Sequence, residues 1–230
     1  MKISSFLIAS LLLTSPALIT SCSSIAKLAG VNTASIPGVD LLKGDQNKLV
    51  AQHSEATILL LESQLHAANA CGLNELSAQI ESQIKQLKSD PNDASKLTSI
   101  QSSLSGRSEI INKKLSEIQD KSALKANELV LSHKKLSDGL KAEGALAMSN
   151  VDLGMRLVKV MKSGSVDPVS KGLLATQFRP IIYFVTTLPK DYKMMRQAQT
   201  VQKEAGKKLN ITLPTVKSQK SKLPTISFDI

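Results

Sequence analysis

The stretch that decides the fold covers residues 94–137 and reads ASKLTSIQSSLSGRSEIINKKLSEIQDKSALKANELVLSHKKLS. Its apolar residues recur at steps of seven, with further apolar residues three or four positions away. The residues in this pattern are Leu97, Ile100, Leu104, Ile111, Leu115, Ile118, Leu129 and Leu136. Such spacing is typical of an amphipathic helix that packs lengthwise on another helix, as in a coiled coil. We therefore predict one long helix over 94–137, roughly 66 Å in length.

Helical patterns continue on both sides of this stretch. Before it, apolar residues at helical spacing run from Asp45 to a polar turn cluster at 89–93. After it, the same periodicity continues until the Ser and Gly residues of 163–165. A last helix is predicted from about Asp191 to Leu209. Short turns between these helices would make neighbouring helices antiparallel.

The composition agrees with a helical protein. Aromatic residues make up only 3% of the chain, Trp is absent, and there are 11 Gly and 8 Pro residues. Such a composition favours helices over sheets. We predict an all-α fold, namely an elongated antiparallel bundle of about four helices with coiled-coil-like packing over 45–209. Residues 22–44 would form a flexible tether before the bundle, and 210–230 an extended, basic tail after it.

The first residues of the chain read as an export signal, because a positive start at Lys2 precedes a short apolar core. Ser residues and Pro16 interrupt this core, which is too short to span a bilayer as a helix. The segment ends with Ile19-Thr20-Ser21-Cys22. This motif resembles the lipobox of bacterial lipoproteins, in which an aliphatic and two small residues precede a Cys. We expect residues 1–21 to be a signal peptide; the alternative is an ordinary secretory signal that ends beside Cys22 by chance.

The resemblance to lipoproteins implies a membrane anchor. In that family the Cys thiol receives a diacylglyceryl group, the preceding peptide is removed, and the new amino terminus is usually acylated, as with palmitate. The covalent lipid would be attached at Cys22, and no other cofactor is expected. In many Gram-negative bacteria an Asp directly after the lipidated Cys retains the protein at the inner membrane. Here that position is Ser23, which implies the outer membrane, with the protein facing the periplasm. The rest of the chain resembles no family.

Residues that could carry catalysis or bind metal are sparse. His53, His66 and His133 are the only histidines, and the spacing of the first two puts them on different faces of a helix. No Cys or acidic pair completes a metal-ligand set around them. The pattern Ser-x-x-Lys occurs four times, but the other elements of penicillin-binding enzymes are missing, so chance explains it. We predict a protein that is not an enzyme and holds no metal.

Cysteine usage adds one open question. With Cys22 carrying lipid, Cys71 would have no partner within the chain. We predict that Cys71 is a small buried apolar residue. The alternative is a thiol that forms a dimer, and a homo-oligomer therefore stays open.

The most informative feature for function is charge. The formal net charge is +10, and residues 190–222 hold nine basic residues against two acidic ones. Such a patch attracts anionic lipid headgroups, acidic polysaccharide or the acidic face of a protein. Nucleic acid is a poor candidate for an exported protein. The alternative is an ordinary solvated helix face with a soluble tail.

Four of the chain's six aromatic residues lie in 178–192, next to this basic segment. They could form a pocket or an interface, or simply fill the core of the bundle. The predicted contact surface consists of Arg179, Tyr183, Phe184, Tyr192, Lys193, Arg196, Lys203 and Lys207. In the last helix Tyr192 would face inward, whereas Lys193 and its basic neighbours would form one exposed face.

Together these features predict a membrane-anchored envelope lipoprotein. It would act as a non-enzymatic scaffold or docking component, with a protein partner or an anionic surface bound at its basic, aromatic C-terminal region. The alternative is a carrier that holds an apolar or amphipathic ligand between the helices.

Overall fold

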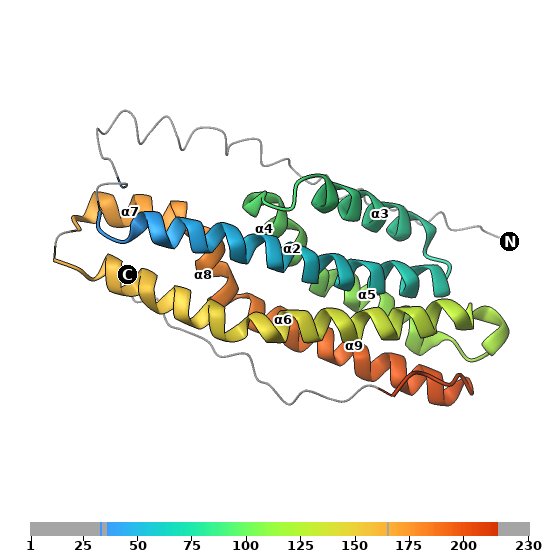
Figure 1. Cartoon of the computed structure of the whole chain (residues 1–230). Coiled ribbons are helices and arrows are strands. Elements are labelled where there is room, and N and C mark those ends of the chain that lie inside the picture. Colours follow the sequence, from blue (N-terminus) through green and yellow to red (C-terminus); the bar gives the residue numbers. More distant parts are fainter. Residues whose placement is uncertain (1–32, 34–35, 165, 216–230) are drawn as a thin grey trace, which may run out of the picture.

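The computed structural model describes residues 33, 36–164 and 166–215, and all regular secondary structure in these residues is helical (Figure 1). The prediction of an all-α fold is therefore confirmed for the described part of the chain. The helices are α2 (Val39–Ala70), α3 (Asn74–Ser89), α4 (Ala94–Ser102), α5 (Leu104–Glu117), the 3-10 helix η2 (Lys121–Ala123), α6 (Ala126–Met161), α7 (Pro168–Gln177), α8 (Arg179–Thr186) and α9 (Leu188–Lys208). The predicted signal peptide, Cys22 and most of the predicted tether and tail lie outside the described residues.

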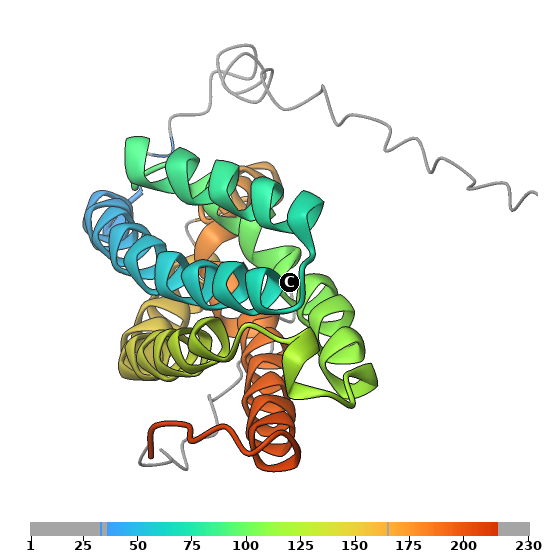
Figure 2. The ribbon, with the colours of Figure 1, turned by 90° about the vertical axis from the view of Figure 1, so that its right-hand side faces the viewer.

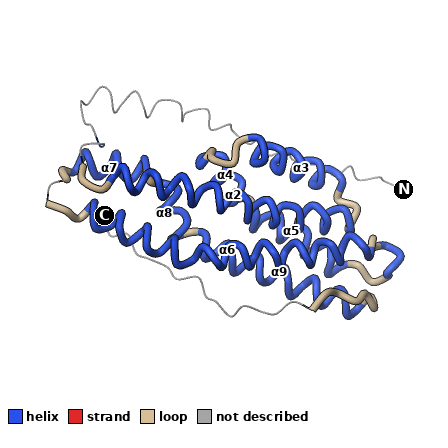
Figure 3. The backbone as a smooth tube through the Cα atoms, viewed as in Figure 1, coloured by secondary structure: helices blue, strands red, loops and turns tan. Residues whose placement is uncertain are grey.

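The two longest helices, α2 and α6, lie side by side and antiparallel through the length of the molecule (Figure 3). Just before α6, the backbone N–H of Lys125 donates to the carbonyl of Ala70 at the end of α2, at 3.1 Å. Gly139 of α6 allows the two helices to approach closely, because a Cβ there would lie 2.7 Å from Cδ2 of Leu60. These contacts set the direction and the spacing of the central pair.

Shorter helices surround this pair. α3 packs on α2, α9 packs on α5 and α6, and α8 contacts α4, α6 and α9. The view along the molecule shows α3 and α9 on opposite sides of it (Figure 2). The buried apolar side chains of these helices form one continuous core. Burial of this apolar surface stabilises the arrangement.

The single long helix predicted over 94–137 is wrong, because the helix is interrupted in two places. At the first, Ser103 separates α4 from α5, and its Oγ donates to the carbonyl of Ile100 at 2.7 Å, so this carbonyl has a partner where the helix ends. At the second, Asp120 accepts the N–H of Ser122 at 2.9 Å in the loop that holds η2. All the apolar residues of the pattern are nevertheless buried. The pattern therefore identified the packing face but missed the helix boundaries.

The helices are shorter and more numerous than the four predicted, so the four-helix description is not confirmed. Coiled-coil-like packing stays a prediction. Pro180 and Pro189, in contrast, lie in the first turns of α8 and α9, where a missing backbone N–H does no harm. Each of these prolines therefore marks the beginning of a new helix.

The packed part of the chain extends beyond the predicted bounds of 45 and 209 at both ends. α2 begins at Val39, and both Val39 and Leu42 are buried, so 39–44 belong to the packed domain rather than to the tether. At the other end, Ile211 is buried and its N–H donates to the carbonyl of Gly206 at 2.8 Å. The predicted tail therefore starts by packing on α9. In both places the polar composition of the segment predicted a loop, but the burial of a few apolar side chains stabilises the segment on the domain.

Candidate functional site

The predicted contact surface does not stay together in the structure. Phe184 and Tyr192 are buried, with only 1% and 5% of their surface exposed, so neither can meet a partner. Their place in the contact surface is therefore wrong. Arg179 is exposed at the start of α8, and Tyr183 is half-buried. The segment between the two prolines forms the short helix α8, and packing against α4, α6 and α9 buries its aromatic side.

Each buried aromatic side chain has a defined neighbour. The ring of Phe184 stacks on the ring of His53 with the centroids 3.9 Å apart. Tyr192 donates its hydroxyl to the carbonyl of Leu140 at 3.2 Å. The hydroxyl of Tyr183 donates to Oδ2 of Asp191 at 2.8 Å, and burial together with this carboxylate raises the pKa of Tyr183. The aromatic residues therefore join α8 and α9 to the rest of the core.

The basic residues of α9 do form one exposed face. Lys193, Lys203 and Lys207 are exposed, and Arg196 is partly exposed with its guanidinium 5.6 Å from the centre of the Tyr192 ring. They follow one another at steps of three, seven and four residues, which places them on one side of a helix. From Lys193 to Lys207 this row is roughly 21 Å long. α9 as a whole holds six basic and two acidic residues.

Two lysines of α6 extend this face. Two contacts show that α6 and α9 are antiparallel. The carbonyl of Leu140 accepts from Tyr192, and Nδ1 of His133 lies 3.3 Å from Oε1 of Gln202. The contact that comes first along α6 therefore comes second along α9. Each of these four contact residues is followed directly by a lysine. The four lysines are Lys134 and Lys141 on α6 and Lys193 and Lys203 on α9, and all are exposed.

These lysines turn to the same outer side of the helix pair. In each helix the lysine is one residue after the contact residue, which is a rotation of about 100° around the helix axis. Because the two helices run in opposite directions, the two rotations have opposite senses in space and bring the lysines to the same side of the pair. Burial lowers the pKa of His133, and the nearby charge of Lys203 lowers it further, which agrees with a lysine beside this contact. We call Lys134, Lys141, Lys193, Arg196, Lys203 and Lys207 the α6–α9 basic surface. The sequence predicted the α9 residues of this surface. Lys134 and Lys141 of α6 follow only from the pairing of α6 with α9.

A buried polar cluster lies between α2 and α6. Nδ1 of His53 lies 2.6 Å from Oε2 of Glu143, and Nε2 of His53 lies 2.9 Å from Oδ1 of Asn150. Gln101 of α4 donates its amide to Thr57 at 2.9 Å and to Oε1 of Glu143 at 3.4 Å. A paired His and Glu could exchange a proton, but His53 is 0% exposed and Phe184 covers its ring. A substrate would have to displace α8 to reach it, so the cluster fits a role in packing.

The sequence singles out His53 but not the other members of the cluster. A signal was present, because Glu143 and Asn150 stand in the seven-residue register of the apolar Leu129, Leu136 and Leu157. Polar residues in an apolar register indicate buried groups that need partners.

A second polar cluster surrounds Arg107, which is also buried. Its guanidinium donates to Gln64 at 3.1 Å, to the carbonyl of Ile100 at 3.2 Å and to Gln83. Burial lowers the pKa of Arg107 to about 10. These neutral acceptors replace water around the cation and join α5 to α2, α3 and α4.

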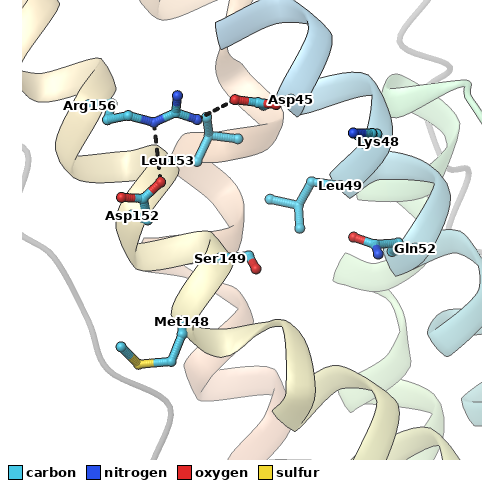
Figure 4. A pocket seen from close by; sticks show the side chains of 9 residues that line it. All are labelled: Asp45, Lys48, Leu49, Gln52, Met148, Ser149, Asp152, Leu153 and Arg156. Atoms are coloured by element: carbon cyan, nitrogen blue, oxygen red, sulfur yellow. Dashed lines mark hydrogen bonds and ion pairs between the residues drawn. The ribbon is translucent and has the colours of Figure 1, made fainter. Parts of the chain in front are cut away.

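An open groove lies on the surface between α2 and α6 (Figure 4). Its volume is about 520 Å³, and its apolar lining residues are Leu49, Met148 and Leu153. Arg156 bridges Asp45 of α2 and Asp152 of α6 at one end. An interior pocket between α2, α5, α6 and α9 has a volume of only about 10 Å³, which is the size of one water molecule.

Other site chemistry is limited in the part of the chain that the structure describes. No group of three or more His, Cys, Asp or Glu residues among residues 33, 36–164 and 166–215 could hold a metal ion. No helix in these ranges has the length and hydropathy needed to cross a bilayer. Cys71 is a buried free cysteine, and burial raises the pKa of its thiol to about 11.

The chain matches no protein family, no curated protein and no solved structure. Its function must therefore be argued from its own residues.

Proposed function

We propose that this protein is a lipid-anchored, non-enzymatic docking component of a bacterial envelope. The anchor would be the lipid on Cys22, for which the lipobox resemblance of Ile19-Thr20-Ser21-Cys22 is the support. Ser23 supports a place at the outer membrane, facing the periplasm. The contact would be made by the α6–α9 basic surface with an anionic partner. Compared with the expectation from sequence, this surface loses Arg179 and the three aromatic residues and gains two lysines of α6.

One observation carries this proposal, namely that the lysines of the surface stand without acidic partners. Lys134, Lys141, Lys193, Lys203 and Lys207 make no ion pair with any of the described residues. Unpaired like charges repel one another, so their grouping is unfavourable in the free protein and favourable beside an anion. A lysine close to an anionic surface contributes about 1 kcal/mol to binding, so several together are sufficient for docking.

Site-specific crosslinking in intact envelopes tests the proposal. A photoreactive residue at Thr200, which is exposed between Lys193 and Lys203 on α9, would be placed in the native lipidated protein. We expect crosslinks to envelope components that disappear in the Lys193→Glu/Lys203→Glu variant. The control variant is Lys85→Glu/Lys113→Glu, which changes the same number of exposed charges on α3 and α5. Crosslinks that are the same in both variants would contradict docking through this surface.

The α2–α6 groove favours a second candidate function, the carrier. Its volume of about 520 Å³ lies within the range of small-molecule sites, and it combines apolar and charged residues. An amphipathic ligand would place its apolar part on Leu49 and Leu153 and its head near Lys48. Displacement of a fluorescent fatty acid by extracted envelope lipids would test this, with Lys48→Glu as the variant expected to bind less. Equal binding by this variant and the native protein would contradict the carrier.

A further inference from the structure

Two exposed methionines continue the α6–α9 basic surface along α6. Lys134, Lys141, Met148 and Met155 follow one another at steps of seven residues. A step of seven turns an α-helix by only about 20°, so all four lie on one side of α6. Met148 and Met155 have 74% and 55% of their surface exposed. One side of the helix therefore presents cations in its first half and exposed methionines in its second half, where Asp152 between them is paired with Arg156 at 3.2 Å.

These methionines lie beyond the end of α9. Tyr192 of α9 lies opposite Leu140, and α9 begins at Leu188, one turn before Tyr192. α6 continues past that level to Met161, so α9 does not cover its outer side at Met148 and Met155. Leu41 of α2 is also exposed, by 72%, and stands in the helical register of the groove residues Asp45 and Lys48. Leu41, Met148 and Met155 are thus half of the exposed large apolar side chains of the described chain, and Met148 lines the α2–α6 groove.

We propose that this combined face, the α6–α9 basic surface with Met148 and Met155, binds the surface of an anionic lipid bilayer. The lysines would contact the headgroup phosphates, and the two methionines would enter the boundary between headgroups and acyl chains. The protein would lie with α6 parallel to the membrane, along roughly 32 Å of helix from Lys134 to Met155. This inference rests on the proposed function, because it names the partner of the same surface.

Three features favour a bilayer over an acidic protein. The cations are mostly lysines, which act as point charges on flexible stems and need no fixed partner geometry. Met148 and Met155 are unbranched, adaptable and mostly exposed, and Met148 lines the open groove between α2 and α6. The aromatic side chains that would anchor a protein interface, Phe184 and Tyr192, are buried. A lipid on Cys22 would in addition tether this face to a bilayer, so that the membrane surface is always at a high effective concentration around it.

Fluorescence in vesicles tests the inference with the native lipidated protein. Met148→Cys introduces a thiol for a fluorescent probe, while Cys71 is buried and Cys22 would carry lipid. The labelled protein is reconstituted in vesicles of neutral phosphatidylcholine, with or without about a third of anionic phosphatidylglycerol. Quenching by spin-labelled lipids reports insertion of the probe, and quenching by aqueous iodide reports exposure to water. Ser82→Cys on α3, which packs on α2 and not on α6 or α9, is the control position.

We expect lipid quenching at position 148 in anionic vesicles only, and its loss in high salt. Lys193→Glu/Lys203→Glu should lower the ratio of docked to free domains about tenfold or more, whereas Lys85→Glu/Lys113→Glu should leave it unchanged. A probe at position 148 that stays open to iodide in anionic vesicles overturns the lipid inference. If the crosslinks from Thr200 still depend on the lysines in that case, the docking function survives with a protein or polysaccharide partner. If those crosslinks are also independent of the lysines, both proposals are wrong. Quenching that is equal in neutral vesicles overturns the role of charge.

Discussion

Nδ1 of His53 on α2 lies 2.6 Å from Oε2 of Glu143 on α6, and both side chains are buried. The contact joins the two longest helices near the middle of their shared interface. Oδ1 of Asn150 lies 2.9 Å from Nε2 of His53, and the amide of Gln101 donates to Oε1 of Glu143 at 3.4 Å. The ring of Phe184 stacks on the ring of His53. Because these neighbours come from α4, α6 and α8, the pair fixes how α2, α4, α6 and α8 are aligned.

Removal of one member of this pair should strongly destabilise the fold. Glu143→Ala leaves a buried ring nitrogen of His53 without its partner, and an unpaired buried polar group costs about 1–3 kcal/mol. Urea unfolding followed by circular dichroism measures the change. Glu109→Ala, which removes an exposed carboxylate from α5, should change the unfolding free energy by less than about 0.5 kcal/mol. If Glu143→Ala is no more harmful than Glu109→Ala, the pair does not align the helices.

The close approach of α2 and α6 predicts opposite effects of the same substitution at two glycines. A Cβ at Gly139 would lie 2.7 Å from Cδ2 and 3.1 Å from the backbone nitrogen of Leu60, so Gly139→Ala should destabilise by about 1–3 kcal/mol. Gly106 of α5 has no atom within 4 Å of such a Cβ, so Gly106→Ala should stabilise by about 0.4–1 kcal/mol. Thermal unfolding of the two variants gives the comparison. A shift in the same direction for both would mean that Leu60 does not restrict position 139.

The periodicity of single segments could be read from the sequence, but the pairing of segments could not. In α9, the spacing predicted that Tyr192 faces inward and Lys193 outward, and burial confirms this. The boundary at Ser103 was missed, because a single Ser in a helical pattern is common and its hydrogen bond to Ile100 depends on the fold. Heptad spacing alone therefore overestimated the length of the helix.

The candidate site shows the same division. The cations of α9 were predicted from sequence, because neighbouring charges on one helix follow from spacing alone. Lys134 and Lys141 were missed, since nothing in the sequence says that His133 meets Gln202 or that Leu140 meets Tyr192. Phe184 was assigned to the surface because it is aromatic and lies near basic residues. Its burial depends on His53, which is far away in the sequence and provides the face on which Phe184 stacks.

His133 predicts a dependence of stability on pH. Burial lowers its pKa in the folded protein below the ordinary value of 6.5, whereas the unfolded chain protonates near that value. At pH values below about 6.5 the unfolded state therefore binds more protons than the folded state, and the unfolding free energy falls. The stability is fully present above that pH. Urea midpoints measured between pH 5 and pH 7.5 should fall less steeply on acidification in His133→Gln than in the native protein. Equal slopes would contradict the assignment to His133.

Cys71 should be unreactive in the folded protein. It is buried, and burial raises the pKa of its thiol to about 11, so almost no thiolate is present near neutral pH. We expect no modification by iodoacetamide over the time in which a cysteine at position 148 reacts completely, and rapid modification after addition of denaturant. Peptide mass spectrometry measures both. A disulfide-linked dimer through Cys71 in the native protein would restore the alternative of a dimer-forming thiol.

The lipid anchor gives the last prediction, and it concerns Cys22 alone. If the lipobox is used, the native protein should begin at Cys22 and carry a diacylglyceryl thioether and an acylated amino terminus. The protein should then stay with the membrane fraction in high salt, because two or more acyl chains anchor a protein stably and salt does not weaken them. Cys22→Ser should leave the leader uncleaved or release an unlipidated chain, which intact-mass analysis distinguishes. In high salt any remaining binding of a released Cys22→Ser chain to membranes should be lost, because only the lysines of the α6–α9 basic surface would hold it there. An unmodified thiol at Cys22 in the native protein would contradict the anchor and leave docking to the charged surface alone.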